Sequence, residues 1–342
     1  MFEKTSVNRR QFLKQTGLLS VAAAAAAAAP LSEVLAFDRE LTKVTRSTEA
    51  MSTYVTITVL APSVAQADDA IEKAFAEMKR VTKLMDRFDS ASPVSVLNRD
   101  GALSGLPEEV ADVLARSNYF HTLSRGEFDI TVKPVVDLYQ QSFSKAGQPP
   151  SDRDLQKAME LVNGNGVLVN GRDARLAKPG MGVTLDGIAK GYIIDVGAAT
   201  LRRQGIQHLL VDAGGDIRAI GGKEQGRGWT IAVRNPDGPN YADKITMTDG
   251  AVATSGNYEV YFDREKLFHH IINPQTGVSP YQATSVSVAA PNTTQADALS
   301  TAVFVMGAKR GKEFVDTVPG TECLVITRDG RKTATDGWKK MA

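Results

Sequence analysis

The segment QADALST (295–301) places a carboxylate and a hydroxyl four residues apart, at Asp297 and Thr301. On a helix, two side chains with this spacing project from the same face. Carboxylate and hydroxyl oxygens are hard ligands of the kind that Mg²⁺ prefers, and substrate phosphates can complete its shell. The alternative is that Asp297 stabilises the positive end of a helix while Thr301 packs. The residues alone support the two interpretations about equally.

A second segment, LDGIAKG (185–191), combines Asp186, Gly187 and Lys190. It lies at a predicted strand-to-helix junction, where free backbone N–H groups and an ammonium would suit an anion. The alternative is a turn with a solvated lysine. Two further segments also have simple structural explanations. DAGGDI is explained as a turn whose glycines permit positive φ, and GEFDITVKP as the start of a strand with Asp129 in a turn.

His269 and His270 stand side by side in LFHHIINPQTG, in a chain with four histidines. The succession YEVYF, DREK, LFHHII predicts a hairpin with a four-residue turn. Consecutive side chains of a strand point to opposite faces, so only one of the two histidines can face a site. A histidine in such a strand is more often structural than catalytic, and the residues alone leave the role of His270 open.

The surrounding pattern predicts an α+β fold with mixed, largely antiparallel sheets and helices packed around them. Alternating β-branched residues predict strands, and apolar periodicity predicts helices. The strands are expected at 54–60, 229–235, 285–290 and 323–327, with a short one before 187 and hairpins over 208–222 and 258–272. The helices are expected at 63–85, 107–123, 151–161 and 295–306, near Lys312, and in a segment that ends at Gly205.

The first 36 residues are typical of a cleaved export signal. NRRQFLK, with its Arg9-Arg10 pair, resembles a twin-arginine signal, and cleavage after Ala36 would leave 37–342 as one domain. A Sec signal or a membrane anchor is the alternative, but the alanine-rich run 18–29 is too short and too weakly apolar to span a bilayer. We expect a soluble periplasmic protein without a stable membrane anchor.

Charge and cysteine content exclude several classes of protein. The chain has 40 Lys and Arg against 39 Asp and Glu, and residues 1–36 hold four of the basic and two of the acidic ones. The remainder has a net charge of −1, which would not attract nucleic acid. A lone Cys323 in an apolar run permits no intramolecular disulfide and is expected in the core.

Neither a dinucleotide fingerprint nor a P-loop is present in the sequence, so any nucleotide must be bound by a different kind of site.

Six segments in order over most of the chain resemble the ApbE family of FAD:protein FMN transferases. They are GEFDITVKP, LDGIAKGY, DAGGDIRAIG, TSGNYEVYF, HIINPQTG and ADALSTAVFVMG. The resemblance implies a fold with a central FAD cleft. It also implies a Mg²⁺-dependent enzyme that transfers the FMN half of FAD to a Ser or Thr hydroxyl of an acceptor protein and releases AMP.

The resemblance also assigns roles to individual residues. Asp297 and Thr301 match the metal ligands, and Gly187 matches a position that lends its backbone carbonyl. His270 matches the histidine required for transfer, which implies that it faces the site while His269 faces away. The positions that match FAD contacts are Met51, Glu127, Phe128, Asp129, Thr184, Lys190 and Ile271.

Two segments depart from the family pattern: Ser52 follows Met51 where glycine is usual, and residues 87–98 are a degraded form of a Ser/Tyr-rich segment. The expected partner is an acceptor flavoprotein subunit of a periplasmic or membrane respiratory system, which the enzyme would help to mature. Two alternatives are a Mg²⁺-dependent FAD pyrophosphatase and a periplasmic flavin carrier. The carrier would need the pocket but not His270.

Overall fold

The computed structural model describes residues 41–223, 227–236, 238–258, 260–263 and 267–341. Leu41–Ala342 form one unit. The export signal predicted at 1–36 lies outside the described residues. Within them, no helix is both long enough and apolar enough to cross a membrane.

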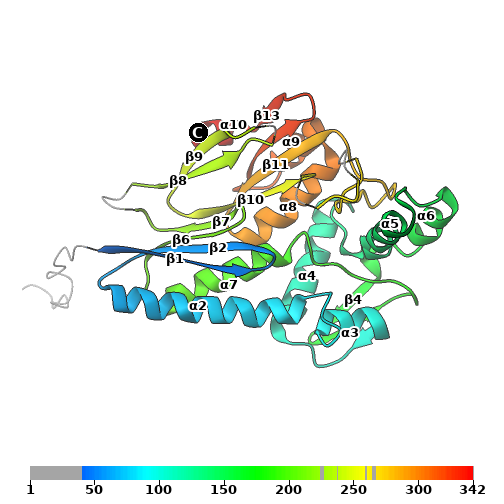
Figure 1. Ribbon diagram of the computed structural model, residues 1–342, viewed down its shortest axis with the longest axis horizontal. Helices are drawn as coiled ribbons and strands as arrows, with labels where there is room; N and C mark the ends of the chain where they lie inside the picture. Colours follow the sequence, from blue (N-terminus) through cyan, green and yellow to red (C-terminus); the bar gives the residue numbers. More distant parts are fainter. Residues whose placement is uncertain (1–40, 224–226, 237, 259, 264–266, 342) are drawn as a thin grey trace, which may run out of the picture. The chain divides into compact units, whose positions relative to one another are not determined.

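The centre of the described fold is an eight-stranded sheet in which each strand is antiparallel to its neighbours (Figure 1). This confirms the predicted α+β class with antiparallel sheets. All eight residues of β11 are buried, because helices cover one face of the sheet and other elements cover its second face. In sheet order, the strands are β1 (Thr42–Ala50), β2 (Thr53–Ala61), β6 (His208–Ala213), β7 (Asp216–Ile220), β10 (Gly250–Gly256), β11 (Ala283–Ala290), β12 (Glu322–Thr327) and β13 (Lys332–Ala334).

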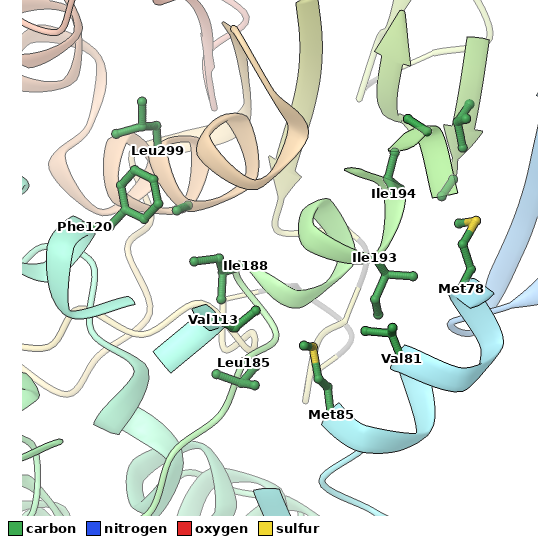
Figure 2. Close-up of a cluster of buried hydrophobic side chains, with 14 of the residues drawn as sticks. Met78, Val81, Met85, Val113, Phe120, Leu185, Ile188, Ile193, Ile194 and Leu299 are labelled. Carbon is green, nitrogen blue, oxygen red and sulfur yellow. The ribbon is translucent and has the colours of Figure 1, made fainter. Parts of the chain in front are cut away.

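Helix α7 (Ala189–Arg203) packs between α2 (Val64–Met85) and α8 (Thr293–Met306) on this sheet. Figure 2 shows their apolar contact, with Met78 and Val81 of α2 lying beside Ile193 of α7. A Cβ at Gly197 would lie 2.5 Å from Met78 Sδ, so the close approach of α2 and α7 requires glycine there. The LDGIAKG segment leads into α7, and QADALST lies within α8.

Smaller elements surround this layer. Two of them are a three-stranded sheet, β3-β5-β4, and a two-stranded sheet, β8-β9. Their strands are β3 (Ala102–Leu103), β4 (Val167–Asn170), β5 (Asp173–Leu176), β8 (Trp229–Arg234) and β9 (Tyr241–Met247). The remaining helices are α3 (Pro93–Asp100), α4 (Glu108–Leu123), α5 (Lys133–Ala146), α6 (Asp152–Met159), α9 (Ala308–Val315) and α10 (Asp336–Met341), with 3₁₀ turns η1 (Ile130–Val132) and η2 (Gly164–Gly166).

Three sequence predictions of local structure are wrong. GEFDITVKP does not begin a strand, because the Asp129 side chain caps η1, which leads directly into α5. The expected short strand before Gly187 is irregular chain. The predicted 258–272 hairpin is reduced in the described residues to one bridge, Tyr261 to His269, with Phe262 and His270 donating backbone hydrogen bonds across it.

Ser52, which stands where the family pattern usually has glycine, lies in the turn between β1 and β2. Ala50 pairs with Thr53, so Met51 and Ser52 form a two-residue turn, with φ of +53° and +59°. Both angles lie in the left-handed region, which favours glycine at the second position of such a turn.

We therefore expect Ser52→Gly to raise the free energy of unfolding by about 1 kcal/mol, because it removes the strain of a side chain in the left-handed region. Urea denaturation measures the change. Ser47→Gly makes the same chemical change inside β1, where φ is not positive, and should lower stability instead. A loss of stability in Ser52→Gly would contradict the argument.

Candidate functional site

The structure brings almost all of the predicted site residues to one pocket, which we call the narrow pocket. It lies where the chain around η1, the start of α7, β10, the 270–272 segment and α8 meet. Its volume is about 70 Å³. The predicted residues in its wall are Glu127, Phe128, Asp129, Thr184, Gly187, Lys190, His270, Ile271, Asp297 and Thr301. Met51 is the exception and lies in a neighbouring pocket.

Asp297 and Thr301 lie one turn apart on α8, and both reach the narrow pocket. A Cβ added at Gly187 would lie 2.9 Å from Thr301 Oγ1, which shows how closely this glycine approaches the hydroxyl. Asp297 is 5% exposed, and its Oδ2 accepts a hydrogen bond from the Gly191 N–H at 2.9 Å. The three positions therefore present a carboxylate, a hydroxyl and a backbone segment at one place.

Asp195 holds α8 in position from the neighbouring helix α7. Its carboxylate accepts hydrogen bonds from the backbone N–H groups of Thr293 and Thr294, at 3.0 and 2.8 Å. These are orphan donors of the first turn of α8, which need a partner outside the helix. A Cβ at Gly191 would lie 2.3 Å from the Thr293 carbonyl oxygen, so α7 and α8 can meet this closely only at a glycine. The contact sets the position of Asp297.

Lys190 adds a cation to the same wall. Its Nζ lies 3.2 Å from Asp216 Oδ2, and Asp216 is buried at the start of β7. The pair holds the ammonium at the edge of the pocket. Arg87, whose side chain is 11% exposed, forms an ion pair with Asp186 at 3.2 Å. Lys190 thus lines the narrow pocket, Arg87 lines the pocket beside it, and each cation is held by a carboxylate.

The Asp129 carboxylate has a structural role, because both of its oxygens accept hydrogen bonds from backbone N–H groups of the protein. Oδ1 accepts from the Thr131 N–H at 2.7 Å, and Oδ2 accepts from the Gly164 N–H at 2.9 Å. The ring of His121 lies beside it, with Nδ1 3.4 Å from Oδ2. Asp129 therefore fixes the course of the chain that presents Glu127 and Phe128.

The paired histidines have separate environments. His269 is 1% exposed and packs edge-on against the ring of Phe304. His270 instead lines the narrow pocket and the pocket beside it. The structure therefore directs His270 alone of the pair toward the candidate site, although the segment is not a regular strand.

The hydrogen bonds of the two rings indicate opposite tautomers. His270 Nδ1 lies 3.0 Å from the Val260 carbonyl oxygen, which can only accept, so Nδ1 carries the proton and Nε2 keeps a lone pair. His269 Nε2 lies 3.0 Å from the Pro280 carbonyl oxygen, so Nε2 is its donor. Burial lowers the pKa of His270 despite the opposing bond to Val260, which favours the neutral ring.

A neighbouring pocket of about 700 Å³, which we call the wide pocket, shares Asp186, Lys190 and His270 with the narrow one. Its other walls are largely apolar and aromatic. They include Met51, Met85, Phe88, Val136, Ile193, Val260, Tyr261 and Phe262. A flat apolar ring system would fit such a pocket.

Sequence reasoning missed several residues of these pockets. Thr254 and Ser255 of β10 line the narrow pocket, and Ser255 Oγ lies 2.8 Å from Ser300 Oγ. They belong to the TSGNYEVYF segment, which could have indicated them. Asp216, the ion-pair partner of the pocket residue Lys190, lies in DAGGDI, a segment whose glycines indicate only a turn. No local signal pointed to Arg87, which meets Asp186 only through the fold.

His269 should make stability depend on pH. Burial lowers its pKa to about 4 from the ordinary 6.5, so the unfolded chain binds this proton more readily than the native one. The stabilisation is fully present above pH 6.5 and is lost as pH falls toward 4, with a loss of about 2 kcal/mol between pH 7.5 and 5.

Urea denaturation at these two pH values, compared with His269→Gln, measures the effect. Glutamine can keep an N–H near the Pro280 carbonyl but does not titrate. Its variant should therefore lose about 2 kcal/mol less between the two pH values than the parent. An equal loss in both proteins would contradict the assignment.

Known proteins resemble this chain over most of its length. The ApbE family model matches residues 51–325. The FAD:protein FMN transferase of Treponema pallidum is 31% identical over 80% of this chain and 81% of its own length, and that of Haemophilus influenzae is 31% identical over 75% and 78%. The ApbE protein of Thermotoga maritima superposes with a TM-score of 0.80 at 30% identity, covering 88% of this chain and 99% of that structure. The flavin transferase ApbE of Vibrio cholerae gives 0.77 at 26%, covering 88% and 100%.

Proposed function

The chain belongs to the ApbE family, and we propose that it transfers the FMN half of FAD to a Ser or Thr hydroxyl of an acceptor protein in a Mg²⁺-dependent reaction. The hydroxyl oxygen forms a bond to the FMN phosphorus, the bond between that phosphorus and the bridging oxygen breaks, and AMP leaves. The observation that carries this proposal is that His270 and Lys190, which line both pockets, share the wall of the narrow pocket with Asp297 and Thr301.

The donor set fits a hard cation. Among the described residues, no group of three or more His, Cys, Asp or Glu side chains could hold a metal. Asp297 and Thr301, with the Gly187 carbonyl beside them, offer oxygen ligands only, and they would hold Mg²⁺ with substrate phosphates completing the shell. When bound, Mg²⁺ supplies charge stabilisation at the phosphate oxygens.

Side chains of the protein would stabilise the phosphate charge, accept the proton and bind the flavin ring. Lys190, held by Asp216, lies where it can offset phosphate charge. His270 accepts the proton of the acceptor hydroxyl at Nε2, because its Nδ1–H is occupied by the Val260 carbonyl. The wide pocket, with its apolar and aromatic walls, takes the isoalloxazine ring.

One incubation separates this function from the alternatives. The protein is mixed with FAD, Mg²⁺ and a candidate acceptor, and flavin fluorescence on a denaturing gel is measured together with free AMP. A transferase gives a fluorescent acceptor band and AMP in equal amounts. AMP without a labelled acceptor would indicate a pyrophosphatase, and FAD binding without either product would indicate a carrier. The expected acceptor is a flavoprotein subunit of a periplasmic or membrane respiratory system.

Export through the twin-arginine route is part of the proposal, which rests on the sequence of residues 1–36. Replacing Arg9-Arg10 with Lys-Lys should leave precursor in the cytoplasm and remove the mature protein from the periplasm. Immunoblots of the two fractions measure this. An undiminished periplasmic signal would assign the segment to the Sec route.

A further inference from the structure

A pocket lined by cations adjoins the wide pocket, and we call it the basic pocket. Its volume is about 350 Å³, and it shares Arg87 and Phe88 with the wide pocket. Its wall includes Arg87, Phe88, Ser90, Ser95, Arg99 and Lys133. Three of these side chains are cationic, and among the described residues no acidic side chain lines this pocket. A wall with one sign of charge attracts counter-ions, so the basic pocket favours an anion.

Two of the cations are held by carboxylates that lie outside the basic pocket. Arg87 pairs with Asp186 and Asp137, at 3.2 and 3.5 Å, and Lys133 also pairs with Asp137. The side chains of Arg87 and Lys133 are only 11% and 21% exposed, so they are partly withdrawn from water. Because neither carboxylate lines the basic pocket, these ion pairs hold the cations in place without adding negative charge to its wall.

The place of Lys133 in its helix favours a role outside that helix. Lys133 is the first residue of α5, at the positive end of the helix dipole, where a cation is disfavoured. Its pair with Asp137 also has the less favourable order, with the cation N-terminal to the carboxylate. The dipole therefore adds to the positive potential of the basic pocket, and Arg99, 59% exposed, adds a further cation.

The wide pocket, which leads into the basic pocket, keeps large apolar side chains exposed. Phe88 is 73% exposed, Val260 52% and Tyr261 47%. Exposed apolar groups that adjoin charged ones are typical of a surface that another protein covers. His270, which would accept the proton of the acceptor hydroxyl, lines the same wide pocket. An acceptor protein at His270 would therefore cover this surface, which continues into the basic pocket through Arg87 and Phe88.

We propose that the basic pocket is a docking site for an acidic segment of the acceptor protein, with Arg99 and Lys133 binding a carboxylate of that segment. This inference rests on the proposed transfer to an acceptor protein. The FAD phosphates are a poorer match, because Lys190 and the oxygen ligands of the narrow pocket supply a site for them. Loss of the charged hydrogen bonds should weaken acceptor binding about 10- to 100-fold.

Kinetics with the acceptor subunit that the parent labels test the inference, at saturating FAD and Mg²⁺. Arg99→Gln combined with Lys133→Gln should raise the KM for this acceptor about 10- to 100-fold. The kcat and the calorimetric Kd of FAD should stay unchanged, because the variant removes contacts to the acceptor alone. Its KM should also depend less on salt than that of the parent.

A matched control variant combines Arg331→Gln with Lys312→Gln. Arg331 pairs with a carboxylate close in sequence, as Arg99 does. Lys312 pairs with a carboxylate four residues further on, as Lys133 does. The control should keep the kinetic constants of the parent, and melting temperatures show whether each variant is folded.

A second measurement identifies the carboxylate on the acceptor. Mass spectrometry of the labelled acceptor locates the modified hydroxyl, and the Asp and Glu residues near it are replaced one at a time by Asn or Gln. One such replacement should raise the KM of the parent enzyme. It should cause no further rise with the Arg99→Gln, Lys133→Gln enzyme, because both changes remove the same interaction.

The outcomes distinguish the inference from the function on which it rests. Normal labelling with an unchanged KM in the folded double variant would overturn the inference alone. A weaker Kd for FAD in that variant would also overturn it and would assign the basic pocket to the nucleotide. Inorganic phosphate that binds the parent but not the double variant, with an unchanged KM, would make it a site for small anions. If the parent binds FAD but labels no acceptor, the proposed function fails and the inference fails with it.

Discussion

Asp297→Ala should lower flavin transfer by about 10³-fold or more, because it removes the carboxylate through which the protein would hold Mg²⁺. Asp297 is almost fully buried in the narrow pocket, and Thr301 on the next turn reaches the same pocket. The same loss is expected in the parent protein treated with EDTA, and added Mg²⁺ should restore the parent but not the variant. Acceptor fluorescence after gel electrophoresis measures the rate. Full activity of Asp297→Ala in the presence of chelator would end the proposal of a metal site here.

The alanine variant also removes a structural contact, because Asp297 Oδ2 accepts from the Gly191 N–H. Asp297→Asn separates the two effects, since its amide oxygen can still accept this bond while the negative charge is gone. We expect a similar loss of transfer with a nearly unchanged melting temperature. Thr301→Val removes the neighbouring hydroxyl at nearly constant volume and should cost less. Recovery of activity in Asp297→Asn would instead indicate that the residue acts through α7.

The sequence predicts well those features that depend on short spacing. Asp297 and Thr301 can be placed on one helix face because four residues make about one turn. Helix α2 is predicted from its apolar stripe, and the Ser63 hydroxyl caps it as an N-cap residue should. The β6–β7 hairpin is marked by its two glycines, both with positive φ. Each of these features is determined within one segment of the chain.

Other elements could not be predicted because their signals are weak or not local. β1 carries charged and hydroxyl side chains and buries only Val44, since it is an edge strand that pairs, among the described strands, with β2 alone. α5 follows a β-branched run, Ile130–Val132, which suggests a strand until the Asp129 cap is seen. The contact of Arg87 with Asp186 joins positions 99 apart in the sequence. Only the three-dimensional packing brings such residues to one pocket.

His270→Ala should lower transfer by about 10²- to 10⁴-fold while FAD binding and folding stay nearly unchanged, because the ring acts on the proton of the acceptor hydroxyl. His270→Asn is the better matched variant, since its amide N–H can still reach the Val260 carbonyl while the basic Nε2 is absent. It should be as inactive as the alanine variant. His269→Ala should show the reverse, with a loss of stability of about 2–4 kcal/mol from the buried site and little change in rate per folded molecule.

The pH dependence of transfer adds an independent test of the base role. Burial lowers the pKa of His270, so the ring stays neutral and able to accept a proton at pH values somewhat below the ordinary histidine pKa of 6.5. The rate should therefore hold steady as pH falls to about 6.5 and decline below it, while FAD binding persists. Because asparagine does not titrate in this range, the small residual rate of His270→Asn should lack this decline. Equal losses of transfer in the His269 and His270 variants, or an acid decline that survives in His270→Asn, would assign the proton transfer to another group and leave His270 a structural residue at the junction of the two pockets.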